Sequence, residues 1–505
     1  MKIEMMKHNL IAGCLCLMMW NGISSNIQAQ DRLYRNTFPL GDVELLDGPF
    51  KHAQELNLKV LMEYDVDRLL APFLKEAGLP LKAEPFPNWA GLDGHVGGHY
   101  LSAMAMNYAA TGNEECKKRM EYMLSELKRC QESNGDGYIG GIPNGKVLWT
   151  DIKNGKVESI WKYWAPWYNV HKIFAGLRDA WMYTGNQEAL DMFLKLCDWG
   201  ISVTEGLSDN QMEQMLANEF GGMDEIFADA YQITGEQKYL TTAKRFSHRW
   251  LFDSMAAHKD NLDNIHANTQ IPKVIGYQRI AEVCGDNQYL DAADFFWNIV
   301  ACKRSLALGG NSRREYFSAM DDFRSHVEVR EGPESCNTYN MLKLTEGLFR
   351  MTGKATYTDF YERALYNHIL STQHPEHGGY VYFTSARPAH YRVYSKPNSA
   401  MWCCVGTGME NHGKYGEFIY THASDSLFVN LFIPSRLNWE QEKVTITQET
   451  QFPDAETSRF TVGLKGGKSR HFKLLVRRPA WVTEGYEVKC NGKVVEASEK
   501  TDGSS

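Results

Sequence analysis

The sequence has no excess of basic residues, and after its first 20 residues it has no long apolar run. Its 505 residues carry 54 Lys and Arg against 62 Asp and Glu, a formal net charge of -8. Nucleic-acid-binding proteins usually present a basic patch or stripe, so this balance argues against a nucleic-acid partner. No later segment has about 18 continuous apolar residues, so we expect no membrane span in the rest of the chain.

The sequence also lacks the closely spaced cysteines that are typical of a small disulfide-rich protein. The chain has 11 cysteines, and those beyond the N-terminal segment are scattered. A chain of this length does not need disulfides to stabilise its core, so buried free thiols are the default expectation. Cys336, Cys403 and Cys404 are the exceptions, because each stands in an unusual local pattern.

The N-terminus has the pattern of a secretory signal peptide. Basic residues precede a mostly apolar run, Asn9–Trp20, and Ile27-Gln28-Ala29 forms an acceptable cleavage site. The run is too short to cross a bilayer core of about 30 Å. We therefore predict a signal peptide over residues 1–29 and export to the periplasm. Ile11-Ala12-Gly13-Cys14 also resembles a lipobox, so a lipoprotein acylated at Cys14 is the alternative.

One sequence motif recurs along the first two thirds of the chain. A helical apolar stripe ends in Tyr-x-x-Thr-Gly or a close variant, a few polar residues follow, and a new helix begins. The glycines of the five copies are Gly112, Gly185, Gly235, Gly285 and Gly353. Glycine directly after an apolar helix is a C-cap signal. Repetition at this scale indicates a repeated helical hairpin, and Gly- and aromatic-rich insertions between copies favour a closed toroid. We predict an (α/α)6 barrel over residues 30–385.

The pattern then changes to short runs rich in Val, Thr, Tyr and Phe, several of them alternating. They are Tyr380–Thr384, Tyr391–Tyr394, Ser426–Phe432, Lys443–Gln448, Ser458–Gly463 and His471–Val476. We predict a β-sandwich over residues 386–505, to which Asp31–Asp47 adds an N-terminal strand. Because Glu487–Val495 begins another hairpin just before the last residue, we expect this sandwich to be truncated.

Two cysteine-containing segments suggest a metal site. Glu334 and Cys336 stand at the start of an amphipathic helix, where the local field favours anions and lowers the pKa of a thiol. Cys403 and Cys404 are adjacent and precede a glycine-rich stretch. One carboxylate and three thiolates complete a tetrahedral zinc site, and a closed site of four ligands is normally structural. The alternative is that each thiol is simply a buried apolar group.

A third segment, Gly309–Phe317, carries one carboxylate among aromatic residues. Glycoside hydrolysis needs a proton donor for the leaving oxygen, and Glu315 is the candidate. The alternative is a surface carboxylate paired with Arg313 or Arg314. Histidines gather in the predicted mouth loops, where a neutral ring offers sugar hydroxyls one donor and one acceptor. The candidate sugar ligands are His95, His99, His171 and His266.

Three stretches carry a family resemblance. Gly-Gly-Asn-Ser-x-Arg-Glu-x-Phe (309–317), Arg-Glu-Gly-Pro-Glu-Ser-Cys (330–336) and Trp-Cys-Cys-x-Gly-Thr-Gly-Met-Glu (402–410) closely resemble the β-L-arabinofuranosidases of glycoside hydrolase family 146, a sister of family 127. Gly91–Ser102 and His266–Lys273 are also similar to that family. The resemblance covers about residues 35–490 and implies an (α/α)6 barrel with β-sandwich domains.

The resemblance also implies a mechanism. Cys403 matches the nucleophile, Glu315 the general acid/base, and Glu334, Cys336, Cys403 and Cys404 the zinc ligands. His266 matches a sugar-contacting histidine, and His95, His99 and His171 match more loosely. The implied enzyme is exo-acting, retains the anomeric configuration and releases L-arabinofuranose from arabinose-containing oligo- or polysaccharide.

Two other classes of protein stay open at this point. Sugar isomerases and epimerases also use helical toroids, with histidine pairs as acid and base, and need no metal. A non-catalytic glycan-binding lipoprotein with a structural zinc would use the same residues without releasing sugar. A related hydrolase acting on another furanoside or pyranoside is a third alternative, and oligomeric state is not indicated by the sequence.

Overall fold

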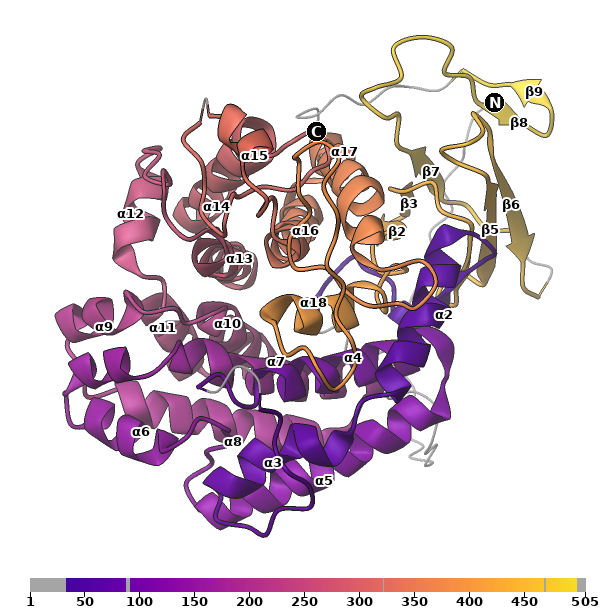
Figure 1. The fold of residues 1–505 in the computed structure, drawn as a ribbon. Helices are drawn as coiled ribbons and strands as arrows, with labels where there is room; N and C mark the ends of the chain where they lie inside the picture. Colours follow the sequence, from indigo (N-terminus) through magenta and orange to yellow (C-terminus); the bar gives the residue numbers. More distant parts are fainter. Residues whose placement is uncertain (1–32, 88–90, 321, 467–468, 497–505) are drawn as a thin grey trace, which may run out of the picture.

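The computed structural model describes residues 33–87, 91–320, 322–466 and 469–496. It consists of a helical double ring with β-sheets beside it (Figure 1). The predicted signal peptide and the lipobox cysteine lie outside the described residues, so export and acylation stay predictions. None of the helices in the described part of the chain is long and apolar enough to cross a membrane.

Six helices form the inner ring, in which each packs against the next and the last packs against the first. They are α4 (His95–Thr111), α7 (Pro166–Thr184), α10 (Met223–Thr234), α13 (Ala267–Cys284), α16 (Ser335–Thr352) and α18 (Cys403–Asn411). Outside them lie α3 (Val66–Glu76), α5 (Glu114–Asn134), α8 (Gln187–Thr204), α11 (Gln237–Arg245), α14 (Asn287–Ile299) and α17 (Ala355–Ala364) (Figure 1). The predicted (α/α)6 barrel is confirmed. The other helices are α2 (Pro49–Met62), α6 (Gly145–Lys153), α9 (Asp209–Leu216), α12 (Arg249–Ala256) and α15 (Arg324–Glu328).

The repeated glycine motif stands at the C-terminal end of five of the six inner helices. Each of its glycines has a left-handed backbone, with φ between 67° and 75°, and donates its N–H to the carbonyl four residues earlier. Residues with a Cβ adopt this conformation at a cost, which explains the repeated glycine. The predicted hairpin loops are therefore confirmed. The sixth inner helix, α18, ends instead at His412 with an ordinary right-handed backbone.

The ring closes later in the sequence than predicted. We placed the end of the barrel at residue 385, whereas α18 lies beyond that residue and packs against both α4 and α16. The strands predicted over Tyr380–Thr384 and Tyr391–Tyr394 are wrong. Their alternation correctly indicates extended backbone, but that backbone forms isolated bridges to three separate partners, Gln373, Tyr394 and Glu334, and hence no continuous ladder.

The β-region contains two facing sheets. The first has the antiparallel order β1 (Val43–Leu45), β4 (Ser435–Trp439), β5 (Val444–Thr450), β6 (Ser458–Leu464), and the second has the order β2 (Tyr420–Ala423), β3 (Ser426–Val429), β7 (Lys473–Val476), with β3 and β7 parallel. The predicted N-terminal strand is confirmed as β1. The sheets meet where Tyr420 Oη lies 2.9 Å from Ser435 Oγ and the rings of His422 and Trp439 are 6.0 Å apart. A short hairpin, β8 (Lys489–Cys490) and β9 (Lys493–Val494), follows.

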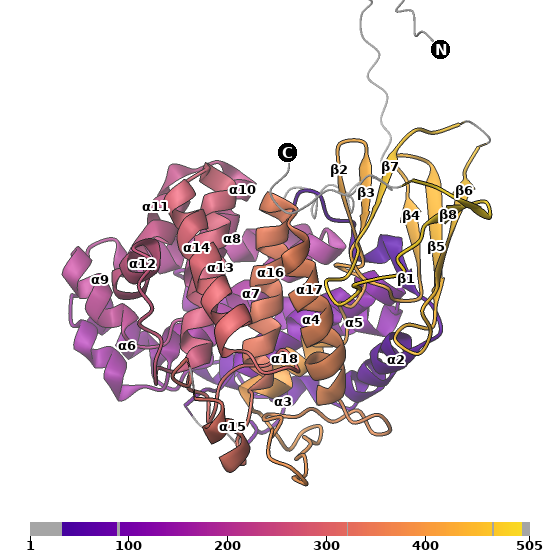
Figure 2. The same cartoon turned by 90° about the horizontal axis from the view of Figure 1, so that it is seen from above.

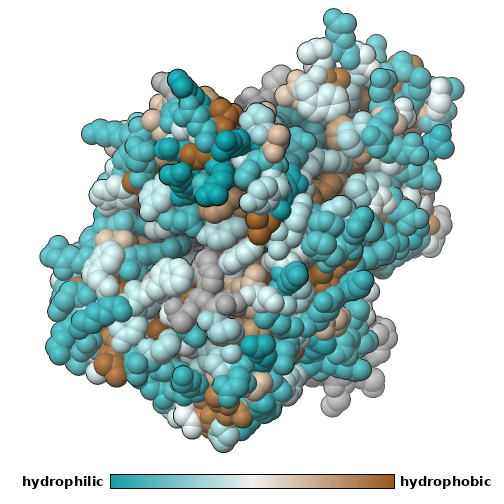
Figure 3. Space-filling view, viewed as in Figure 1, coloured by the Kyte–Doolittle hydropathy of each residue, from teal (hydrophilic) through white to brown (hydrophobic). Residues whose placement is uncertain are grey.

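One large apolar cluster runs through the barrel and into the sheets, and a second, small cluster contains Cys336, Cys403 and Cys404. The sheets stand at one side of the barrel (Figure 2). The face seen in Figure 1 is mostly hydrophilic, with apolar residues scattered across it (Figure 3). Charged and polar groups also lie inside the barrel. Their burial costs free energy unless hydrogen bonds or ion pairs compensate it, so these groups are the unusual feature of this fold.

Candidate metal and active site

The candidate residues gather at one end of the inner ring. His95 is the first residue of α4, His266 is the N-cap of α13, Glu334 is the N-cap of α16, and Cys403 is the first residue of α18. Four inner helices thus point their N-termini at one mouth of the barrel. The partial positive charge at a helix N-terminus favours thiolates and carboxylates there.

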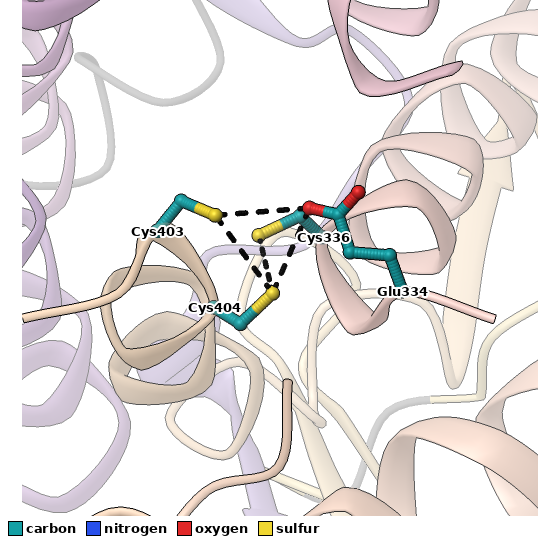
Figure 4. Close-up of side chains that lie close together, drawn as sticks. All are labelled: Glu334, Cys336, Cys403 and Cys404. Carbon is teal, nitrogen blue, oxygen red and sulfur yellow. Dashed lines mark hydrogen bonds between the residues drawn. The ribbon is translucent and has the colours of Figure 1, made fainter. Parts of the chain in front are cut away.

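Glu334, Cys336, Cys403 and Cys404 form one cluster, in which the ligand atoms all lie within 4.8 Å of one another (Figure 4). The sulfur atoms of Cys336 and Cys404 are 3.1 Å apart, and those of Cys403 and Cys404 are 3.9 Å apart. Glu334 Oε1 lies 3.7 Å from both Cys403 Sγ and Cys404 Sγ. The structure therefore brings together all four predicted metal ligands, from two inner helices that are adjacent in the ring.

These donors fit a tetrahedral zinc ion. A Zn–S bond of about 2.3 Å gives a donor-to-donor distance of roughly 3.8 Å, close to most of the observed separations. The second carboxylate oxygen of Glu334 is buried and has no hydrogen-bond partner among the described residues. A buried carboxylate in that state is costly unless a cation compensates it.

The three thiols differ in their electrostatics. Hydrogen bonds from Cys336 and Cys404 hold the pKa of the Cys403 thiol well below its usual range. Burial raises the pKa of Cys336 and Cys404, and it also raises the pKa of the Glu334 carboxyl. Cys403 is therefore the thiol most easily deprotonated, and the thiolate is the nucleophilic form of cysteine.

The Glu315 loop is a tight turn with an unusual backbone. Arg313 and Tyr316 exchange two backbone hydrogen bonds across Arg314 and Glu315. Both central residues have positive φ, 50° and 72°, as a type I′ turn requires. Such conformations are unfavourable for residues with a Cβ and often mark functional sites. The loop is held by Ala267 N–H, which donates to the Glu315 carbonyl at 2.8 Å.

Glu315 faces the site. Its Oε1 accepts a hydrogen bond from the Tyr382 hydroxyl, and its Oε2 lies 3.9 Å from His266 Nε2. Arg314 pairs instead with Glu331, at 3.4 Å, so the ion pair that we considered for Glu315 is not what holds it. The Tyr382 hydroxyl also lies 3.7 Å from Cys403 Sγ. One phenol therefore links the candidate acid/base and the candidate nucleophile.

The four histidines are placed differently. His266 Nδ1 accepts from the backbone N–H of Thr269 at 3.2 Å, so its Nε2 carries the proton that faces Glu315. His95 Nδ1 lies 2.6 Å from the Leu92 carbonyl, and burial lowers the pKa of His95 to about 4. His99 and His171 line one internal cavity of the barrel. Burial also lowers their pKa values, so these three rings are neutral at pH 7.

Sequence reasoning missed two residues of this site, Tyr382 and Glu410. Tyr382 was hidden in a segment that alternates like a strand. Glu410 accepts hydrogen bonds from His99 and Tyr339, and it stands seven residues after Cys403. Seven residues are about two helical turns, so spacing alone places Glu410 on the same face as Cys403.

Comparison with known proteins assigns the family. A family model described as "Beta-L-arabinofuranosidase, GH127 catalytic domain" matches residues 42–417, and the GH127 middle-domain model matches residues 426–504. The chain belongs to the GH127 family. A search of curated proteins finds no match. GH127 is a glycoside hydrolase family, and the predicted β-L-arabinofuranosidase is thereby confirmed at family level, whereas the assignment to family 146 stays a prediction.

Solved structures of GH127 enzymes share the fold. A GH127 β-L-arabinofuranosidase from Geobacillus stearothermophilus T6 is 19% identical, with a TM-score of 0.69 over 90% of this chain and 77% of that one. A second structure, a GH127 β-arabinofuranosidase, is 20% identical, with a TM-score of 0.70 over 93% and 78% of the two chains. The family assignment favours a hydrolase over the isomerase and the non-catalytic binding protein.

Proposed function

We propose that this GH127 enzyme is an exo-acting, retaining β-L-arabinofuranosidase in which Cys403 is the nucleophile and Glu315 the general acid/base. The contact of the Tyr382 hydroxyl with both residues carries the proposal. Two groups that share one hydroxyl are separated by no more than two hydrogen-bond lengths. That spacing suits a retaining enzyme, in which the two catalytic groups are about 5–5.5 Å apart.

In the first step, the Cys403 thiolate attacks the anomeric carbon of the arabinofuranoside. The C–S bond forms as the bond to the leaving oxygen breaks, and the protonated Glu315 carboxyl donates its proton to that oxygen. In the second step, the Glu315 carboxylate removes a proton from water, the water oxygen attacks the same carbon, and the C–S bond breaks. Two inversions restore the starting configuration and the thiolate.

Glu334, Cys336, Cys403 and Cys404 would hold a zinc ion, for which their chemistry and spacing are suited. Bound there, the ion would act as a Lewis acid that keeps the Cys403 sulfur deprotonated and in place. The other three ligands fix the starts of α16 and α18 relative to each other. His95, His99, His171 and His266 would bind the hydroxyls of the furanose.

The barrel interior supports exo action. Beyond His171, the interior is occupied by a buried ion-pair network, in which Arg178 lies 3.0 Å from Glu225 and 2.7 Å from Asp229. These residues are at most 4% exposed, so a polysaccharide could not thread past them. A pocket closed at its inner end admits a chain end and not an internal residue.

The test is a panel of p-nitrophenyl glycosides, with the wild type, Cys403→Ser, Glu315→Gln and Glu331→Gln. We expect the wild type to hydrolyse the β-L-arabinofuranoside, and Cys403→Ser to be inactive. On an arabinofuranosyl disaccharide, Glu315→Gln should lose roughly 10²–10⁴-fold in kcat/KM. On the p-nitrophenyl arabinofuranoside the loss in kcat/KM should be much smaller, because p-nitrophenolate leaves without a proton. Glu331→Gln removes a neighbouring surface carboxylate and should behave as the wild type. No turnover of the β-L-arabinofuranoside by the wild type would refute the proposal.

A further inference from the structure

Glu410 joins three inner helices at the point where the ring closes. It lies on α18, and its Oε1 is 2.5 Å from His99 Nδ1 on α4. Its Oε2 accepts a hydrogen bond from the Tyr339 hydroxyl on α16. The Glu410 side chain is buried, and both of its oxygens are occupied by these two partners. The carboxylate therefore holds the His99 ring in a defined relation to the helices that carry the thiols.

This contact decides which nitrogen of His99 carries the proton. An ionised carboxylate only accepts hydrogen bonds, so Nδ1 must be the donor. In a neutral imidazole, Nε2 is then an acceptor with a free lone pair. His99 Nε2 is buried and has no hydrogen-bond partner within the described ranges. His99 is 3% exposed and lines the internal cavity beside His171, so its unpartnered acceptor is available to a hydroxyl within the barrel.

The same helix also packs against the carbon edge of the ring at Cδ2. A Cβ added to Gly406 would lie 2.2 Å from Cδ2 and 2.8 Å from Nε2 of His99, so only glycine leaves room for the imidazole. Gly406 and Glu410 are one helical turn apart. Helix α18 thus begins with Cys403, one of the candidate metal ligands, and contacts His99 through Gly406 and Glu410 further along the helix.

We propose that Glu410, supported by Tyr339, is a positioning residue that fixes His99 as the Nδ1–H tautomer, so that His99 Nε2 accepts a hydrogen bond from a hydroxyl of the sugar undergoing hydrolysis. The inference rests on the proposed glycosidase function, because the bound sugar is the source of that hydroxyl. Such carboxylate–histidine pairs orient functional rings in many enzymes, and their loss typically reduces function about 10–100-fold. Because Glu410 shares a helix with Cys403, the sugar contact and the nucleophile are positioned by one rigid element.

The tautomer is tested without any substrate. Protein labelled with ¹⁵N-histidine is compared with Glu410→Gln by imidazole ¹⁵N–¹H correlation, and the His99 signals are assigned by their loss in His99→Ala. We expect a protonated Nδ1 and an unprotonated Nε2 in the wild type, and a rise of the opposite tautomer in Glu410→Gln. A wild type with protonated Nε2, or a tautomer that Glu410→Gln leaves unchanged, overturns the proposal even if the enzyme is an arabinofuranosidase.

The functional role is tested by a double-mutant cycle on kcat/KM with His99→Ala, Glu410→Gln and the combination. We expect Glu410→Gln to lose roughly 10–100-fold and to add almost nothing in the His99→Ala background. Glu417→Gln is the matched control, since Glu417 is also buried and accepts from a tyrosine, Tyr183, at 2.9 Å, but does not contact His99. Additive losses, or a fall in zinc content or Tm in Glu410→Gln beyond that in Glu417→Gln, would show a merely structural role.

Discussion

The Tyr382 hydroxyl lies 3.7 Å from the Cys403 sulfur. The same hydroxyl donates its only proton to Glu315, so it holds the carboxylate on the Cys403 side of the mouth. Burial raises the pKa of Tyr382, which keeps the phenol protonated and able to donate. Tyr382 therefore positions Glu315 and carries a fixed dipole beside Cys403.

Tyr382→Phe should lower kcat/KM on arabinofuranosides roughly 100-fold, the effect of removing one aligned donor from an active site. Zinc content should not change, since the four ligand atoms keep their positions. Tyr391→Phe, at a side chain that is 69% exposed, is the control for loss of a hydroxyl. Steady-state kinetics with elemental analysis check the prediction, and a kcat/KM equal to that of the control would contradict it.

Cys404→Ser should abolish stoichiometric zinc binding, because Cys404 is the central donor, within 3.9 Å of the other three. The variant should also lose the stabilisation that metal gives the folded state, about 2.7 kcal/mol when free zinc is 100-fold above its Kd. Thermal unfolding with and without chelator measures this effect. Cys302→Ser, at an exposed thiol, should respond to the chelator as the wild type does. A Tm of the wild type that is insensitive to chelator would argue against the metal.

Gly406→Ala should destabilise the protein by about 1–3 kcal/mol, as expected when an atom is forced into a packed interior. The added Cβ meets the His99 ring at 2.2 Å, and that ring is fixed on its other edge by Glu410. Activity should fall as well, since the imidazole must move. Gly206→Ala is the control, because its added Cβ meets nothing within 4 Å. Equal Tm values for the two variants would contradict the close packing described here.

Lys273 should make stability depend on pH. Its Nζ lies 2.9 Å from His248 Nδ1 and 3.0 Å from Gln270 Oε1, and burial lowers the pKa of Lys273 to about 7. An unfolded lysine titrates near pH 10.4, so between about pH 7 and 10 the unfolded state binds the extra proton. Stability due to this residue therefore rises with pH in that window, by up to about 1.4 kcal/mol per pH unit.

Urea unfolding of the wild type and Lys273→Met at pH 7, 8 and 9 checks this dependence. The free energy of unfolding of the wild type should increase relative to that of the variant as pH rises. A difference that stays constant over the three pH values would show that Lys273 keeps its proton in the folded state.

The sequence predicts the barrel well because its signals are local. Each copy of the glycine motif marks one helix end, and five such ends imply a ring of hairpins. Helix α18 carries no such motif. It has nine residues, four of which are cysteine or glycine, and no apolar stripe. Its place in the ring is decided by contacts with α4 and α16, which are distant in sequence.

The metal cluster was predictable because its ligands occur as two compact pairs with distinctive chemistry. The roles of Tyr382 and Glu410 were not, since tyrosine in an alternating run and glutamate at the end of a short helix are both ordinary. Only the fold brings the Tyr382 hydroxyl into contact with both Cys403 and Glu315, and the Glu410 carboxylate into contact with His99. Side-chain roles that depend on three separate segments have no local signature.

The position of α18 as the last inner helix has a consequence for biosynthesis. A nascent chain that has been synthesised as far as α17 already contains five sixths of the ring but only two of the four candidate metal ligands, Glu334 and Cys336. Ring closure and completion of the ligand set are then a single event, which occurs when Cys403 and Cys404 reach α4 and α16. A barrel that has not yet acquired α18 therefore lacks Cys403, the proposed nucleophile, and metal uptake should report directly on the final step of folding.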